Sequence, residues 1–260
     1  MGEVPATQHF VLVHGTCHGA WCWYKTASLL KDSGFKVTAV DLGGSGLHPG
    51  NADSILSFEE YNKPLMDLLS TTPEDEKVIL VGHSAGGLSI THATHVFGMK
   101  KISLCIYVTA IMLRNGIVSD QDRQAFPDLG DAVDFNFGLG PDRPPTSAII
   151  NPYLQRKFLY QCSPHEDSTL ASMLLRPAPL MPLFSAKFEG ANMGDVDLVK
   201  RVYIKMNKDE IMRPDVHQEM MIKSWPPDEV MFIDTDHSPF FSAPNELHHL
   251  LINASTMYCG

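Results

Sequence analysis

The sequence has no pattern of paired cysteines. Its five cysteines, Cys17, Cys22, Cys105, Cys162 and Cys259, are an odd number and lack the spacing of a zinc site. This argues against a structural metal and against a disulfide framework, which a chain of 260 residues does not need. We therefore expect reduced thiols in a cytoplasmic protein.

Positive charge and long apolar runs are also scarce. Thirty acidic residues against twenty basic ones give a formal net charge of −10, which disfavours extended contact with phosphate backbones or anionic lipid heads. No apolar stretch is long enough to span a membrane, and residues 1–8 lack the basic start, apolar run and cleavage site of a targeting peptide. We expect neither nucleic acid nor a membrane as a partner.

Short apolar runs rich in β-branched residues alternate with helical patterns. The runs predict buried parallel strands with helices covering both faces of the sheet. They lie at 9–14, 36–42, 77–82, 102–108, 201–206 and 229–234, and helices are expected at 21–33, 58–70, 84–97 and 245–255. The second helix is capped by Ser57 and the first is stopped by Gly34. This alternation predicts an α/β fold with a doubly wound, mostly parallel sheet.

The stretch 112–192 breaks this rhythm with clusters of proline and glycine. It predicts a cap inserted into a single domain, 1–260, whose core is formed by about 1–111 and 193–260. The same stretch holds enough large apolar side chains to roof a pocket. These are Phe126, Phe135, Phe137, Phe158, Tyr160, Met173, Leu180, Met181 and Phe184.

A glycine-rich pentapeptide gives the strongest signal for function. The motif at 82–86, Gly-His-Ser-Ala-Gly, follows a predicted strand and precedes a predicted helix. In the α/β-hydrolase fold this G-x-S-x-G context places a nucleophilic serine on a tight turn, with small residues two positions away on each side. The motif therefore predicts an α/β hydrolase with Ser84 as its nucleophile.

A serine nucleophile needs a base and a carboxylate, which in this fold follow it in the order acid, histidine. His237 comes directly after the last predicted strand, and Asp209 follows the strand before it. Glu210 is the neighbouring alternative to Asp209. By contrast, Asp234 and Asp236 lie too near His237 in sequence to reach the far side of its ring easily. We expect the triad Ser84, Asp209 and His237.

The tetrahedral intermediate of acyl transfer needs two N–H donors. Ala85 supplies one, and the loop after the first strand supplies the other, for which we favour Thr16. No metal ion or organic cofactor is needed for this chemistry. The substrate pocket is expected to include Gly15, His18, Phe126, Phe158, Met181 and Ser238.

Three segments carry a resemblance that goes beyond the general fold. They are 10–24 (FVLVHGTCHGAWCWY), 37–42 (VTAVDL) and 78–87 (VILVGHSAGG), and they resemble the plant methylesterase and hydroxynitrile lyase family. The likeness extends over nearly the whole chain. Segments 138–141, 144–150 and 236–241 are most similar to the branch that hydrolyses methyl indole-3-acetate. The resemblance implies a cofactor-free esterase acting on a small-molecule ester, and it leaves a homodimer open.

Departures from the lyases of this family favour hydrolysis. At the positions that the resemblance aligns, this chain has Gly15, Ser238 and His83, where hydroxynitrile lyases of the family carry threonine, lysine and glutamate. Decarboxylases that form methylketones lack the nucleophile and the acid, which this chain keeps as Ser84 and Asp209. We expect a methylesterase, with methyl indole-3-acetate favoured over methyl salicylate and methyl jasmonate. An esterase on an alkaloid or β-keto ester, whose product then loses carbon dioxide, stays an alternative, as do a hydroxynitrile lyase and a non-catalytic binding protein.

Overall fold

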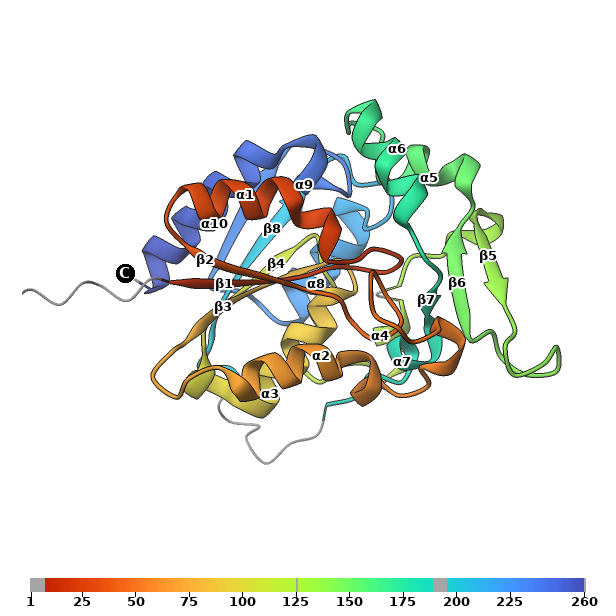
Figure 1. The fold of residues 1–260 in the computed structure, drawn as a ribbon, viewed down its shortest axis with the longest axis horizontal. Helices are drawn as coiled ribbons and strands as arrows, with labels where there is room; N and C mark the ends of the chain where they lie inside the picture. Colours follow the sequence, from red (N-terminus) through yellow and green to blue (C-terminus); the bar gives the residue numbers. More distant parts are fainter. Residues whose placement is uncertain (1–7, 125, 189–195, 260) are drawn as a thin grey trace, which may run out of the picture.

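A six-stranded parallel sheet runs through the middle of the molecule in the computed structural model, which describes residues 8–124, 126–188 and 196–259 (Figure 1). Its strand order is β2-β1-β3-β4-β8-β9, and every neighbouring pair is parallel. The strands are β1 (His9–Val13), β2 (Lys36–Val40), β3 (Val78–His83), β4 (Ile102–Val108), β8 (Lys200–Met206) and β9 (Glu229–Ile233).

Helices cover both faces of this sheet. In Figure 1, α1, α9 and α10 lie on one side of it and α2 and α3 on the other. The helices are α1 (Tyr24–Asp32), α2 (Phe58–Thr71), α3 (Gly86–Lys101), α8 (Glu219–Ser224), α9 (Pro239–Ser242) and α10 (Pro244–Cys259). Short 3-10 turns span Ala20–Trp23, Ala52–Ser54 and Gly130–Ala132, and a π-helical turn spans Pro214–Gln218. The predicted doubly wound α/β-hydrolase fold is confirmed.

The segment between β4 and β8 forms a separate group of elements. A small antiparallel sheet of order β5-β6-β7 lies to one side of the main sheet, with short helices around it (Figure 1). The elements are α4 (Asp120–Arg123), β5 (Val133–Asn136), β6 (Ser147–Ile150), α5 (Pro152–Leu159), α6 (His165–Leu174), β7 (Ala178–Pro179) and α7 (Leu180–Phe184). The division into core and cap stays a prediction. Its second boundary, at 192, lies outside the described residues, as do residues 1–7, which form most of the segment predicted to lack a targeting peptide.

The inner strands are buried because helices pack on both of their faces. Every residue of β1 and β3 is buried, whereas β2 at the edge of the sheet is exposed at Lys36 and half-buried over most of its length. The apolar runs predicted burial of all six strands, which describes the inner strands; the edge strands β2 and β9 are only partly buried because each has a neighbouring strand on one side alone. Within the described residues, none of the helices combines the length and the apolarity that crossing a bilayer requires.

The predicted helices begin within three residues of the observed starts, but α3 and α10 each run four residues beyond the expected ends, to Lys101 and Cys259. Ser57 caps α2, and Glu60 completes a reciprocal capping box. The helix expected to start at Ser84 starts instead at Gly86. Ser84 has a φ of +52°, a left-handed conformation that an α-helix does not admit. The departure from helical geometry therefore falls on the candidate nucleophile.

Candidate active site

Ser84 lies at the carboxyl end of β3 in a strained turn. Its φ of +52° costs a residue with a side chain about 1–3 kcal/mol, which the surrounding structure must offset. The backbone around it does so, since the N–H groups of Gly87 and Ile111 both donate to the Ser84 carbonyl, at 3.1 and 2.9 Å. Ser84 lines the cavity above the sheet, and the turn directs its hydroxyl toward that cavity.

Position 86 requires glycine, because the turn leaves no room there for a side chain. A Cβ at Gly86 would lie 2.5 Å from the carbonyl oxygen of His14 and 2.8 Å from that of Val13. Both are backbone atoms of β1 and its following loop, so relief would require a shift of the central sheet. We expect Gly86→Ala to lower the free energy of unfolding by about 3 kcal/mol, measured by urea denaturation followed by circular dichroism.

Gly34 provides the matched comparison for that variant. It has a φ of +89° and no atom within 4 Å of the position a Cβ would take. Gly34→Ala therefore introduces backbone strain alone, worth about 1–2 kcal/mol. Equal losses of stability in the two variants would contradict the packing explanation for Gly86.

His237 and Asp209 form a buried pair. His237 Nδ1 lies 2.7 Å from Asp209 Oδ2, and each residue is 2% exposed. Because a carboxylate only accepts, Nδ1 carries the proton and Nε2 is left free to accept one from a serine. Both His237 and Ser84 line the same cavity. Within the described residues their side chains make no hydrogen bond to each other, a contact that hydrolases often complete only when substrate binds.

Asp209 is held as a carboxylate despite its burial. The N–H groups of Ile211 and Met212 both donate to its Oδ1 at 2.8 Å. Burial raises its pKa, but the charge of His237 and hydrogen bonds from His237, Thr109 and Met212 outweigh that effect, so the pKa of Asp209 is lowered. An ionised Asp209 can therefore stabilise a positively charged His237.

Two residues that support the triad were not predicted from the sequence. The Thr109 hydroxyl donates to Asp209 Oδ2 at 2.5 Å, and His83 Nε2 donates to the His237 carbonyl at 2.7 Å. Burial lowers the pKa of His83 well below its usual value, so its ring stays neutral. Thr109 directly follows β4, and its place at the carboxyl edge of the sheet is the signal that would have identified it.

Thr16 and Ala85 both line the cavity beside Ser84. In the part of the chain that the structure describes, neither backbone N–H donates a hydrogen bond, so both are available to a developing oxyanion. His18 holds the loop that carries Thr16. Its Nδ1 donates to the Thr16 carbonyl at 2.9 Å, and its Nε2 accepts from the Tyr160 hydroxyl at 2.7 Å. Burial lowers the pKa of His18 to about 3, which keeps this bridge neutral.

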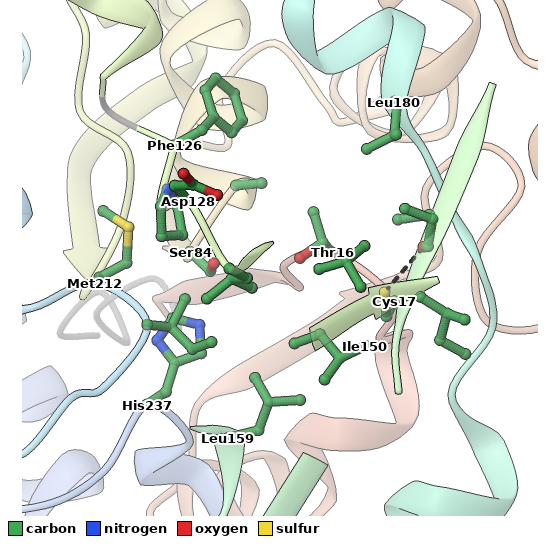
Figure 2. A pocket seen from close by; sticks show the side chains of 18 of the residues that line it. Thr16, Cys17, Ser84, Phe126, Asp128, Ile150, Leu159, Leu180, Met212 and His237 are labelled. Atoms are coloured by element: carbon green, nitrogen blue, oxygen red, sulfur yellow. Dashed lines mark hydrogen bonds between the residues drawn. The ribbon is translucent and has the colours of Figure 1, made fainter. Parts of the chain in front are cut away.

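A cavity of about 280 Å³ opens above Ser84 (Figure 2). Its wall combines the carboxyl edge of the sheet with side chains from the segment between β4 and β8, and it is mostly apolar. The apolar lining includes Ile111, Phe126, Leu129, Val133, Phe135, Ile149, Ile150, Leu159, Leu180, Phe184, Ile211 and Met212.

The predicted pocket residues divide into two groups. His18 and Phe126 line the cavity, whereas Phe158 lines a neighbouring hollow. Met181 does not line it although Leu180 does, because successive helical residues point about 100° apart.

Gly15 and Ser238 also lie outside the lining. A Cβ on Gly15 would be 2.7 Å from the Cβ of Ser84, so this glycine packs behind the nucleophile. Ser238 is fully buried, and its hydroxyl has no hydrogen-bond partner among the described residues. Among those residues, His, Cys, Asp and Glu side chains form no group of three that could hold a metal ion.

Known proteins are similar to this chain in both sequence and fold. The chain matches the model of the alpha/beta hydrolase family over residues 10–249. It is 49% identical to methylesterase 17 of Arabidopsis thaliana over 253 residues, which cover 95% of this chain and 91% of that protein. The crystal structure of methylesterase protein MES16 from Arabidopsis superposes with a TM-score of 0.86 at 41% identity, covering 96% and 100% of the two chains. The crystal structure of tomato methylketone synthase I complexed with 2-tridecanone superposes with a TM-score of 0.87 at 35% identity, covering 97% of this chain and 99% of that one.

Proposed function

Since this chain belongs to the plant methylesterase family of α/β hydrolases and is a carboxylesterase of the serine-hydrolase type, we propose that it hydrolyses methyl esters of small apolar plant acids through Ser84, His237 and Asp209. The observation that carries this proposal is that Ser84, His237, Thr16 and Ala85 line one mostly apolar cavity, while Asp209 lies 2.7 Å from His237. The serine lies in a tight turn, and neither the histidine Nε2 nor the two backbone N–H groups has a hydrogen-bond partner among residues 8–124, 126–188 and 196–259.

The proposed reaction proceeds in two stages. Ser84 Oγ attacks the ester carbonyl while His237 Nε2 takes its proton, and the N–H groups of Thr16 and Ala85 bind the oxyanion. His237 then returns the proton to the methoxide, and methanol leaves an acyl-enzyme. Water activated by the same histidine attacks the acyl-enzyme and releases the acid.

The cavity supports a small, flat acyl group. Phe126, Phe135 and Phe184 lie in a wall that is otherwise mostly aliphatic. Aromatic walls of this kind pack well against a planar ring. Together with the resemblance in segments 138–141 and 144–150, this favours methyl indole-3-acetate among the hormone esters. Methyl salicylate and methyl jasmonate stay in the candidate class, and a cytoplasmic location and a homodimer stay predictions.

The lyase alternative lacks the charge it would need. A leaving cyanide is stabilised by a nearby cation, which the related lyases supply as lysine at the position of Ser238. Here that residue is a buried serine, and among the described residues that line the cavity none is lysine or arginine. We therefore place ester hydrolysis first.

A panel of esters tests the proposal. We expect the wild-type protein to release methanol and the free acid from methyl indole-3-acetate, with a kcat/KM at least about tenfold above that for methyl jasmonate. Mass spectrometry of the products would reveal a β-keto acid that loses carbon dioxide, and an assay for cyanide from mandelonitrile would reveal a lyase. A folded protein that turns over none of the esters would contradict the proposed function.

A further inference from the structure

One acidic side chain lines a cavity that is otherwise apolar. Four ionisable side chains belong to its described lining. They are the two histidines His18 and His237, the buried thiol of Cys17 and the carboxylate of Asp128. Burial raises the pKa of that thiol to about 11, so it carries no charge at neutral pH. A ligand in this cavity therefore meets a negative group and no lysine or arginine.

The geometry of Asp128 places its carboxylate at the rim. Its side chain is exposed to solvent and also lines the cavity, beside Phe126 (Figure 2). Its Oδ1 accepts the N–H of Gly130 at 3.0 Å, which closes a local turn. Its Oδ2 makes no hydrogen bond or ion pair with any of the described residues. One oxygen of the carboxylate thus has no partner in the described part of the chain.

The reaction changes the charge of the ligand beside this group. A methyl ester is neutral, whereas the acid it yields is ionised at neutral pH, because carboxyl groups titrate near pH 4. We propose that Asp128 is a specificity-determining residue, which makes the cavity favour a neutral ester over the carboxylate product and so limits product inhibition. This inference rests on the proposed hydrolysis of esters to acids.

Asp128 also lies beside a second hollow, whose lining differs from that of the cavity. Pro127, Asp128 and Leu129 also line a neighbouring hollow of about 340 Å³. That hollow, unlike the cavity, is lined by a guanidinium, Arg213, together with Glu210 and His217. Asp128 is thus shared by the two hollows, and of the two only the second has a guanidinium in its described lining.

Direct binding measures the effect without any need for turnover. In a Ser84→Ala background, calorimetry gives the dissociation constants of indole-3-acetate and of its neutral isostere, indole-3-acetamide. Asp128→Asn keeps an oxygen for the Gly130 turn but removes the charge. We expect it to tighten binding of the acid about fivefold and to leave the amide within about twofold, with the difference shrinking in 1 M salt.

Asp131→Asn is the matched control. Asp131 is exposed, lies three residues further along and lines neither hollow. It should leave the acid-to-amide ratio unchanged. The inference is overturned if Asp128→Asn does not change that ratio, or if Asp131→Asn changes it equally. A failure of the proposed function is distinguishable, because it would appear as absent ester turnover in the wild-type protein, whereas this ratio is read from binding alone.

Discussion

Replacing Ser84 by alanine is expected to lower kcat for methyl esters by at least about 10³-fold, leaving only a residual rate from the oxyanion donors and substrate binding. Ser84 supplies the attacking oxygen, and its strained φ of +52° exists to present that oxygen to the cavity. The variant should fold as well as the wild-type protein, because the change removes one hydroxyl that forms no hydrogen bond with the described residues. Methanol release under saturating ester measures the loss.

Two further variants make this result specific. Ser84→Ala combined with His237→Ala should be no slower than the slower single variant, because the two residues act as a unit. Ser89→Ala is the control: Ser89 is buried in the same helix that follows the elbow, and its hydroxyl has no partner among the described residues. Retention of substantial turnover by Ser84→Ala, or an equal loss in Ser89→Ala, would contradict the assignment of the nucleophile.

The fold could be predicted well because its signals are local. Each parallel strand is a short apolar run, and strands buried on both faces cannot tolerate polar residues at alternate positions. The elbow is equally local, since its glycines are required by contacts within one turn and the next strand. A Cβ on Gly82 would lie 2.8 Å from the Gly86 carbonyl, and one on Gly86 would meet His14. Chain order then pointed to His237 and Asp209.

The supporting contacts could not be predicted because they join distant segments. Thr109 contacts Asp209 across 100 positions, and His83 contacts His237 across 154. Neither pattern has a spacing that a single sequence reveals. Pocket lining fails for a related reason: Leu180 and Met181 are adjacent and equally apolar, and only the orientation of α7 decides which of them faces the cavity. Asp128 likewise reads as an ordinary turn residue until the cavity is seen beside it.

Asp209→Asn should lower kcat by about 10⁴-fold while changing KM by less than about threefold. An amide at this position can donate to His237 Nδ1, which would then hold the ring in the tautomer that carries its proton on Nε2. That nitrogen could no longer accept the proton of Ser84. The variant also removes the negative charge that the N–H groups of Ile211 and Met212 stabilise in the folded protein.

Glu210 gives the comparison that decides between two neighbouring acids. It is exposed and lines the neighbouring hollow rather than the cavity, whereas Asp209 lies 2.7 Å from the imidazole. Glu210→Gln should therefore keep kcat within about twofold, because the charge of an exposed carboxylate is largely screened by solvent and salt. If kcat fell about 10⁴-fold in Glu210→Gln and little in Asp209→Asn, the acid of the triad would be Glu210. The loop after β8 would then have to rearrange during catalysis, since in the structure Asp209 and not Glu210 is hydrogen-bonded to His237.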